Sequence, residues 1–291
     1  MQTLLIQLLN GIQLSMLIYL LSVGLTLIFG IMRVINLAHG ALYSLGAYLG
    51  VWVAHMSGSF GLALLIAPLF VAMVGGLLHL CAVGPLAVRG RDELEIALLT
   101  FGLMFIAIGA FELIFGKDYM SIALPDWLSG SVSLFGIAYP LYRLFIIAVG
   151  LLIAGGLWLL LDKTIIGAAV RACVDNRDMA VGIGMDIRLV LGMVFALGAG
   201  LAGLAGVIAA PVLSVSPHMG GPILLMALIV VVIGGMGSIG GSFYGSLTVG
   251  ILDTLTRSYF PQLSMFAIYI MLALILVMRP QGLFGRQVSK G

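Results

Sequence analysis

The chain has 291 residues, of which 62% are hydrophobic and 8% carry a formal charge, and its net charge is +2. Soluble globular proteins typically have about a quarter of their residues charged, so this composition excludes a soluble enzyme. The small net charge excludes a nucleic-acid-binding protein. Residues 34–88 and 189–252 contain no formally charged residue, and both runs are longer than the ~20 apolar residues that cross a bilayer. We therefore predict an all-α, polytopic integral membrane protein embedded in the lipid bilayer.

Nine apolar segments are expected to form membrane helices. The segment 36–54 contains Asn36 and His39, and the segment 223–236 is short for a full crossing. Either can therefore be a broken or partial helix, which membranes tolerate where protein buries the freed backbone groups. We predict eight to ten crossings in a bundle built from 4–30, 36–54, 60–83, 96–116, 142–161, 189–213, 223–236, 240–256 and 262–278.

Basic residues indicate the cytoplasmic side, because short cytoplasmic loops retain Lys and Arg. They fall at Arg89 and Arg91, within residues 162–188, and in the tail after residue 278. The predicted crossings put all three groups on one side, so we expect a cytoplasmic C-terminus. The N-terminus lies outside if the segment 36–54 crosses fully.

The segment 162–188 is long for a connection between adjacent membrane helices. Its apolar residues recur at three- and four-residue spacing with charged residues between them, a pattern typical of an amphipathic helix. These apolar residues are Ile165, Ile166, Ala169, Val170, Cys173 and Val174. Such a helix at the cytoplasmic face can either rest on lipid headgroups or dock a soluble partner.

Small residues recur at four-residue spacing within 189–213. Because small side chains let membrane helices approach closely, we predict that this helix packs tightly against its neighbours. The two repeats are Gly192, Ala196 and Gly200, then Gly198, Ala202 and Gly206.

Four stretches of the chain resemble the permease family of branched-chain amino-acid ABC importers, in that family's order. Residues 167–187, GAAVRACVDNRDMAVGIGMDI, resemble the cytoplasmic coupling motif of ABC importer permeases, with Asp178 in the place where Glu is usual. The other three are INLAHGALYSLGAYLG (35–50), VVVIGGMGSIGGSFYGSLTVG (230–250) and MRPQGLFG (278–285). The Asn-Leu-Ala-His-Gly run resembles the shorter, LivH-like type of permease.

The resemblance implies a single transmembrane permease domain over residues 1–291, in a bacterial inner-membrane importer of branched-chain or related hydrophobic amino acids. Its partners would be a second, LivM-like permease, two cytosolic ATP-binding subunits and a periplasmic solute-binding protein. The glycine-rich run 234–241 has no following lysine, so it cannot be a phosphate-binding loop. ATP and magnesium would therefore be bound by partner subunits, and we expect no cofactor, metal site or catalytic residue in this chain.

The resemblance also implies that residues 164–185 receive the motion of the ATP-binding subunits. Charged side chains there could pair with a cleft, and small residues would permit close approach. The expected coupling residues are Gly167, Arg171, Ala172, Asp175, Arg177, Asp178, Ala180, Gly182 and Gly184.

The solute pathway is expected to use sparse polar and small residues within the membrane, because polar groups there are costly and usually functional. The candidates are Asn36, His39, Gly40, Ser44, Gly235, Gly237 and Ser238. Two structural alternatives stay open. Asn36 and His39 could hydrogen-bond across a helix break, and the glycines could form a tight turn between two helices.

Two further charged sites are expected to be local features. Asp253 and Arg257 are one helical turn apart and predict an ion pair near a membrane surface, and Glu112 is expected to be interfacial. The rival function is a secondary transporter driven by an ion gradient, which would need ionisable groups in mid-membrane. The predicted helices contain few such groups, which favours the importer permease.

Overall fold

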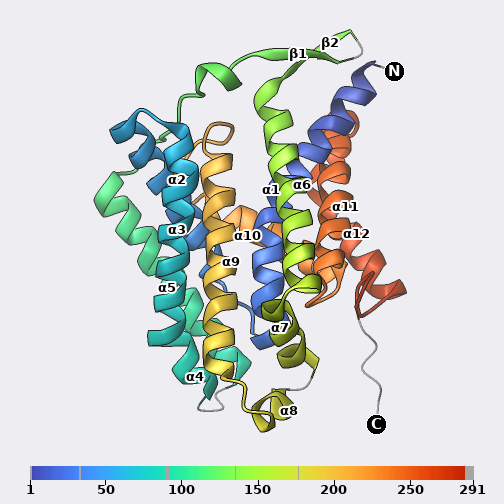
Figure 1. Ribbon diagram of the computed structural model, residues 1–291. Helices are drawn as coiled ribbons and strands as arrows, with labels where there is room; N and C mark the ends of the chain where they lie inside the picture. The colour runs from blue at the N-terminus through green and yellow to red at the C-terminus, as the bar shows by residue number, and fades with distance from the viewer. Residues whose placement is uncertain (1, 33, 89–91, 135, 176, 286–291) are drawn as a thin grey trace.

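The computed structural model describes the chain except for residues 1, 33, 89–91, 135, 176 and 286–291, and at residues 2, 87, 88, 175, 177 and 178 it describes the backbone alone. Figure 1 shows a helical bundle with a two-stranded hairpin at its upper end. The long helices are α1 (Gln2–Met32), α2 (His39–Ser57), α3 (Phe60–Leu78), α5 (Glu93–Phe115), α6 (Leu141–Lys163), α9 (Ile187–Ala209), α10 (Gly220–Gly234), α11 (Ile239–Tyr259) and α12 (Ser264–Met278).

Shorter elements join these helices. A π-helix, His79–Val83, and α4 (Gly84–Val88) extend α3. The strands β1 (Ser131–Leu134) and β2 (Ile137–Pro140) pair antiparallel. Two 3-10 turns, Asp126–Leu128 and Pro261–Leu263, precede β1 and α12. The helices α7 (Ile165–Asp175) and α8 (Arg177–Gly182) connect α6 to α9 at the lower end in Figure 1.

Capping residues account for several helix ends. The Ser59 side chain accepts a hydrogen bond from Leu62 N at the start of α3, and the Ser238 side chain accepts one from Gly241 N at the start of α11. These bonds satisfy backbone N–H groups that the first helical turn leaves unpaired. At its C-terminus α2 ends on Gly58, whose φ of 65° is left-handed and suits glycine. The sequence therefore sets these boundaries locally.

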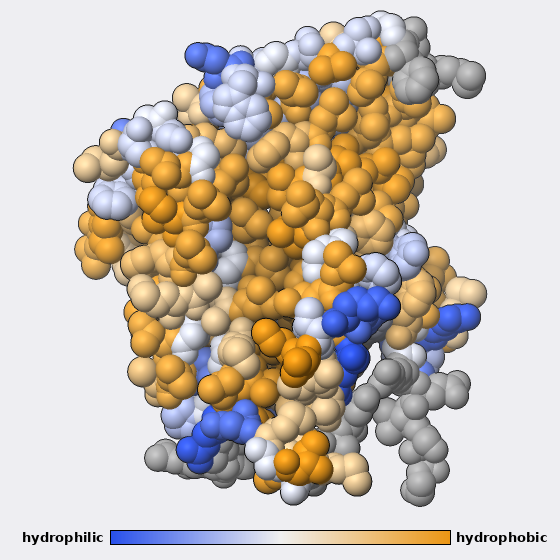
Figure 2. All heavy atoms as spheres, in the orientation of Figure 1, coloured by the Kyte–Doolittle hydropathy of each residue, from blue (hydrophilic) through white to orange (hydrophobic). Residues whose placement is uncertain are grey.

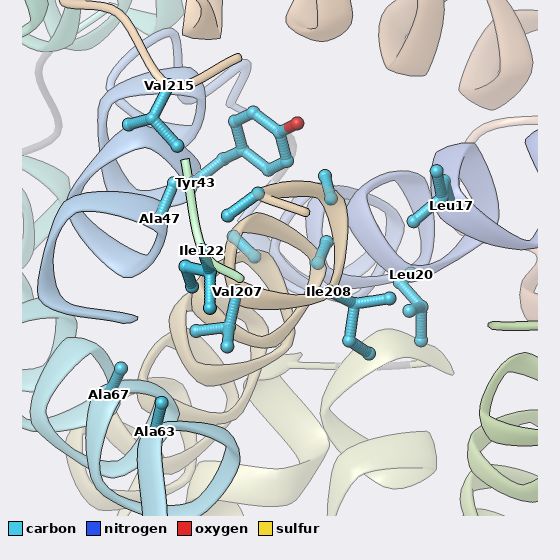
Figure 3. Close-up of a cluster of buried hydrophobic side chains, with 14 of the residues drawn as sticks. Leu17, Leu20, Tyr43, Ala47, Ala63, Ala67, Ile122, Val207, Ile208 and Val215 are labelled. Atoms are coloured by element: carbon cyan, nitrogen blue, oxygen red, sulfur yellow. The ribbon is translucent and has the colours of Figure 1, made fainter. Parts of the chain in front are cut away.

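The centre of the bundle is formed by α1 and α9. The most apolar stretch of α1 is 83% buried and that of α9 is 67% buried, whereas α5 and α12 are 11% and 6% buried. Figure 3 shows part of the core, where Leu17 and Leu20 of α1 lie near Ile208 of α9. The outer helices thus present most of their apolar surface outward, as expected for helices that face lipid or another membrane subunit.

Six helices of the described residues are long and apolar enough to cross a membrane, or up to seven if α10 and α11 together form one broken span. The predicted count of eight to ten crossings is therefore not confirmed. The helix α2 is outside this set, and its polar residues His39 and Ser44 lower its hydropathy. Between α10 and α11 the chain bends by 119°, so the expected interruption near residue 236 is a sharp break.

The helix α2 begins inside the bundle. The chain leaves α1 at Met32 and then turns back along the same helix. As a result, His39 Nε2 lies 3.1 Å from the carbonyl oxygen of Leu21, in the interior of α1. The segment 34–36 has no helical structure and residues 37–38 form a turn. The predicted irregularity of 36–54 therefore lies before the helix, and α2 itself is continuous.

Close approach of backbones explains the small residues of α9. A Cβ atom on Gly206 would overlap the carbonyl oxygen of Tyr43 in α2, and one on Gly198 would lie 2.8 Å from the carbonyl oxygen of Gly24 in α1. On another face, Gly200 packs against Ala72 of α3. The predicted tight packing of this helix is confirmed for both repeats.

The surface in Figure 2 agrees with a membrane location. Hydrophobic residues cover the middle of this face, and strongly hydrophilic residues gather toward its upper edge and its lower part. Such a belt is what a bilayer-spanning surface requires, because lipid tails offer no partners for polar groups.

Candidate functional site

The element formed by α7, α8 and the turn that follows α8, called here the coupling element (residues 165–184), is anchored to α6 at its first turn. Thr164 Oγ1 accepts a hydrogen bond from Gly167 N at 3.1 Å. A Cβ atom on Gly167 would overlap the carbonyl oxygens of Leu160 and Leu161. Gly167 was predicted to be a coupling residue, and the contact that requires glycine there is with the end of α6 in the same chain.

The inner face of the coupling element is apolar and buried. Val170, Cys173 and Ala180 belong to one hydrophobic cluster with residues of three long helices. These residues are Leu27 and Ile31 of α1, Leu157 and Leu161 of α6, and Ile187 and Val190 of α9. A force applied to the coupling element would therefore reach the central helices directly through packed side chains.

The end of α8 is fixed by Gly184. Its φ of 87° is left-handed, Gly184 N donates to Val181 O at 2.9 Å, and Met185 N donates to Ala180 O at 3.1 Å. This is the pattern of a glycine-terminated helix end. Two residues later Asp186 caps α9, accepting hydrogen bonds from Arg188 N and Leu189 N. Hydrogen bonds therefore hold both the end of α8 and the start of α9.

The outer face of the coupling element is exposed and largely apolar. Ile165, Val181 and Ile183 are exposed, and a Cβ atom on Gly182 would meet nothing within 4 Å. The Arg171 guanidinium lies 3.8 Å from the Asp162 carboxylate, both half-exposed, and Ala172 is half-buried. The sequence analysis did not predict this exposed apolar row, because it expected charged side chains to form the docking surface.

Three predicted coupling side chains fall outside the described part of the chain. Asp175 lies at the end of α7, and Arg177 and Asp178 lie in α8, but their side chains are not described. Their expected pairing with a cleft stays a prediction.

The predicted pathway residues near the start of α2 are buried. Asn36 Oδ1 accepts a hydrogen bond from Ala38 N at 3.1 Å, and His39 Nε2 contacts Leu21 O. Ser44 Oγ donates to Gly40 O at 3.2 Å. Asn36 Nδ2 and His39 Nδ1 have no hydrogen-bond partner among the described residues. The contacts of Asn36 Oδ1 and His39 Nε2 agree with the alternative in which these residues hydrogen-bond across a helix break. Asn36 Nδ2 and His39 Nδ1 each remain able to bind a further hydrogen-bonding group.

Two helix N-termini meet beside these residues. A Cβ atom on Gly40 would lie 2.6 Å from Gly220 O, and one on Gly220 would lie 2.7 Å from Ser44 Oγ. Since α2 begins at His39 and α10 begins at Gly220, their positive dipole ends lie together inside the bundle.

The glycine-rich turn lies at the other end of α10. Gly235 and Gly237 have left-handed φ angles of 101° and 84°, and Ser238 caps α11. Leu283 N donates to Ile233 O at 2.8 Å, and Phe284 N donates to Gly234 O at 3.0 Å. The C-terminal motif therefore caps α10, and the glycines have the geometry of a tight turn. Their role in the solute pathway stays a prediction.

A cavity of about 550 Å³ lies between α1, α2, α10 and α11. Its wall includes Tyr43 of α2, which Figure 3 shows beside the segment that carries Val215. None of the seven predicted pathway residues is among the described residues lining it, although Tyr43 is next to Ser44 in sequence. Sequence reasoning missed the cavity because its wall comes from five separate segments, namely α1, α2, residues 213–214, α10 and α11.

The predicted ion pair lines this cavity. Arg257 Nε donates to Asp253 Oδ2 at 2.7 Å, which confirms the pair. Asp253 is only 2% exposed, and its Oδ1 has no hydrogen-bond partner among the described residues. The pair thus belongs to a cavity wall and is more than a local surface contact. Glu112, expected to be interfacial, lies near the upper end of α5 and contacts Lys117 and His218.

Within the described residues no group of three or more His, Cys, Asp or Glu side chains could hold a metal ion. Cys81 is exposed and Cys173 is buried, and neither forms a disulfide within the described residues.

Comparisons with known proteins show what this chain is similar to. A sequence model of the family described as "Branched-chain amino acid transport system / permease component" matches residues 7–278. The permease protein BraD of a high-affinity branched-chain amino acid transport system in Pseudomonas aeruginosa is 28% identical, over 96% of this chain and 95% of that protein. LivH, a permease protein of such a system in Escherichia coli strain K12, is 29% identical over the same shares. LivM of that strain, also a permease protein of such a system, is 27% identical over 93% of this chain and 68% of LivM.

Proposed function

The chain belongs to the family of permease components of branched-chain amino acid transport systems, and from this premise we propose that it is one membrane subunit of an ABC importer for branched-chain or related hydrophobic amino acids. Its relatives are transport permeases and not enzymes. The protein would carry solute by alternating access, with ATP and magnesium bound by two separate cytosolic subunits. It would work in the bacterial inner membrane.

The coupling element is the observation that carries this proposal. An importer permease without its own ATPase needs a rigid surface that transmits motion to the membrane helices. Here an exposed apolar row containing Val181 and Ile183 is backed by the buried residues Val170, Cys173 and Ala180. A helix that only rested on lipid headgroups would need no such tight connection to α1, α6 and α9.

The positions of the basic residues support the orientation. Arg171 belongs to α7, which lies in the lower half of Figure 1. Arg279 directly follows α12, and the C-terminal motif after it contacts Gly235. The β1–β2 hairpin lies at the opposite end. We propose that the lower end faces the cytoplasm, together with the C-terminus, and that the hairpin end receives a periplasmic solute-binding protein.

The second permease is proposed to be a different chain of the same family. Escherichia coli has two such proteins, LivH and LivM, and both are similar to this chain. The nearly unburied helices α5 and α12 offer apolar surface for a second membrane subunit.

A secondary transporter driven by an ion gradient is the second candidate. Asp253 favours it, because a buried carboxylate with an unpaired oxygen is the kind of group that binds a coupling ion. The family assignment and the coupling element favour the importer.

Uptake by the reconstituted protein separates these two functions. The permeases, the ATP-binding subunits and the solute-binding protein are placed in liposomes, and uptake of radiolabelled leucine is followed. We expect uptake with ATP and none with a non-hydrolysable analogue, because the chain lacks a phosphate-binding loop. Full uptake by this chain alone, driven only by a proton or sodium gradient, would contradict the proposal.

A further inference from the structure

The cavity beside Asp253 has the properties of a small-molecule site. Its volume of about 550 Å³ is within the usual range of ligand pockets. It lies near the outer end of the bundle, because its wall includes Gln7 near the start of α1 and Ser258 near the end of α11. These two helix ends are far from the coupling element in Figure 1. Solute arriving at the hairpin end would therefore reach this cavity first.

The wall carries opposite charges at one place. The Arg257 side chain is 59% exposed, and its Nε–H donates a hydrogen bond to Asp253. A guanidinium has five N–H donors in a planar fork, so the group retains donors for a carboxylate. Asp253 holds the fork in position through the 2.7 Å hydrogen bond.

One oxygen of the Asp253 carboxylate lacks a hydrogen-bond donor in the described part of the chain. Its Oδ1 is buried and unpaired among the described residues, and a buried charged acceptor without a donor is destabilising. Asp253 lines the cavity, so a solute bound there is placed to supply the missing donor. An ammonium group supplies the hydrogen-bond donors and the positive charge that the position requires.

The remaining wall has both polar and apolar residues and includes a helix N-terminus. Its apolar residues include Leu14, Ile223 and Met226, which suit an aliphatic side chain. Met219 and Pro222 flank the start of α10 at Gly220. The positive end of that helix dipole favours a carboxylate nearby.

We propose that this cavity binds the solute as a zwitterion, with its ammonium on Asp253, its carboxylate on Arg257 and the first turn of α10, and its aliphatic group against Leu14 and Met226. The inference rests on the proposed function and deepens it, since it assigns the membrane site for an α-amino acid with an aliphatic side chain. The Asp253–Arg257 pair keeps the empty site neutral, and the remaining N–H donors of Arg257 and the unpaired Oδ1 of Asp253 meet the two charges of the solute.

Protection of a cysteine in the wall tests the site. Ile223→Cys is made in a background with Cys81→Ala and Cys173→Ala, and the complex of permeases and ATP-binding subunits is studied in nanodiscs without the solute-binding protein. We expect millimolar leucine to slow labelling of this cysteine by a thiol reagent at least fivefold. The analogues 4-methylpentanoate and 3-methylbutylamine, which each lack one charged group, should protect at least tenfold more weakly.

Charge variants identify the residues responsible. Asp253→Asn should raise the leucine concentration needed for protection at least tenfold, and Arg257→Gln, at a more exposed position, should do the same. Glu112→Gln is the matched control, because Glu112 is an acidic residue outside the cavity wall. Co-purification of the ATP-binding subunits with all three variants shows that the complexes are assembled, and Glu112→Gln should keep the basal ATP hydrolysis of the unaltered complex.

The outcomes separate the inference from the function on which it rests. Intact ATP-driven leucine uptake without cysteine protection, or equal protection in Asp253→Asn, would overturn the inference alone. Failure of the unaltered complex to take up leucine would overturn the proposed function and the inference together.

Discussion

Replacing Ile183 with aspartate is expected to reduce ATP-driven uptake about 30-fold while leaving the protein folded. Ile183 is 71% exposed at the end of the coupling element, so no core contact is lost. Apolar anchors at the centre of an interface typically contribute about 2 kcal/mol, which corresponds to about 30-fold in affinity. A charge placed there should weaken the contact with the ATP-binding subunit by this amount. Uptake and ATP hydrolysis are measured on the same liposomes.

Ile183→Met is the matched control, because methionine keeps an apolar side chain of similar size and should retain near-normal uptake. Basal ATP hydrolysis of Ile183→Asp should persist while its stimulation by solute is lost. Normal coupling in Ile183→Asp would contradict docking through this surface and would favour the alternative in which the helix rests on lipid headgroups.

Replacing Gly46 with leucine is expected to lower the free energy of unfolding by about 3 kcal/mol. A Cβ atom on Gly46 would overlap the backbone of Gly203 in α9. Neither backbone is free to move aside, so α2 and α9 must separate and lose packing along their length. Thermal unfolding in detergent, followed by loss of the monodisperse peak, measures the change.

Gly102→Leu is the control for this substitution. Gly102 also lies inside a long helix, α5, but a Cβ atom there would meet nothing within 4 Å. The unfolding temperature of this variant should stay within a few degrees of that of the unaltered protein. Equal destabilisation by both changes would show that the effect comes from helix propensity and not from the contact between α2 and α9.

Local signals in the sequence predicted much of the fold. The long apolar segments correspond to α1, α3, α5, α6 and α9, and the spacing of Asp253 and Arg257 predicted their ion pair. The amphipathic pattern of residues 165–174 corresponds to α7. In each case the physical cause lies within one or two helical turns, so the pattern is visible in the chain itself.

The features that were missed depend on residues far apart in sequence. The cap on α10 joins Ile233 to Leu283, and the cavity combines residues from α1 to α11. The number of membrane crossings was also hard to predict. The helix α2 starts inside the bundle next to Leu21, and the hydropathy of a segment does not show how deep in the membrane a helix begins. Such contacts follow from how the helices assemble.

Cross-linking from Ile183→Cys in the assembled complex tests the coupling role most directly. With Cys81 and Cys173 replaced by alanine, a short thiol cross-linker should join residue 183 to an ATP-binding subunit, and ATP should change the yield. Val132→Cys on β1, at the opposite end of the bundle, should give no such product. If residue 183 reacts only with labelled lipid or with soluble reagent, in every nucleotide state, the coupling element does not receive the motion of the ATPase.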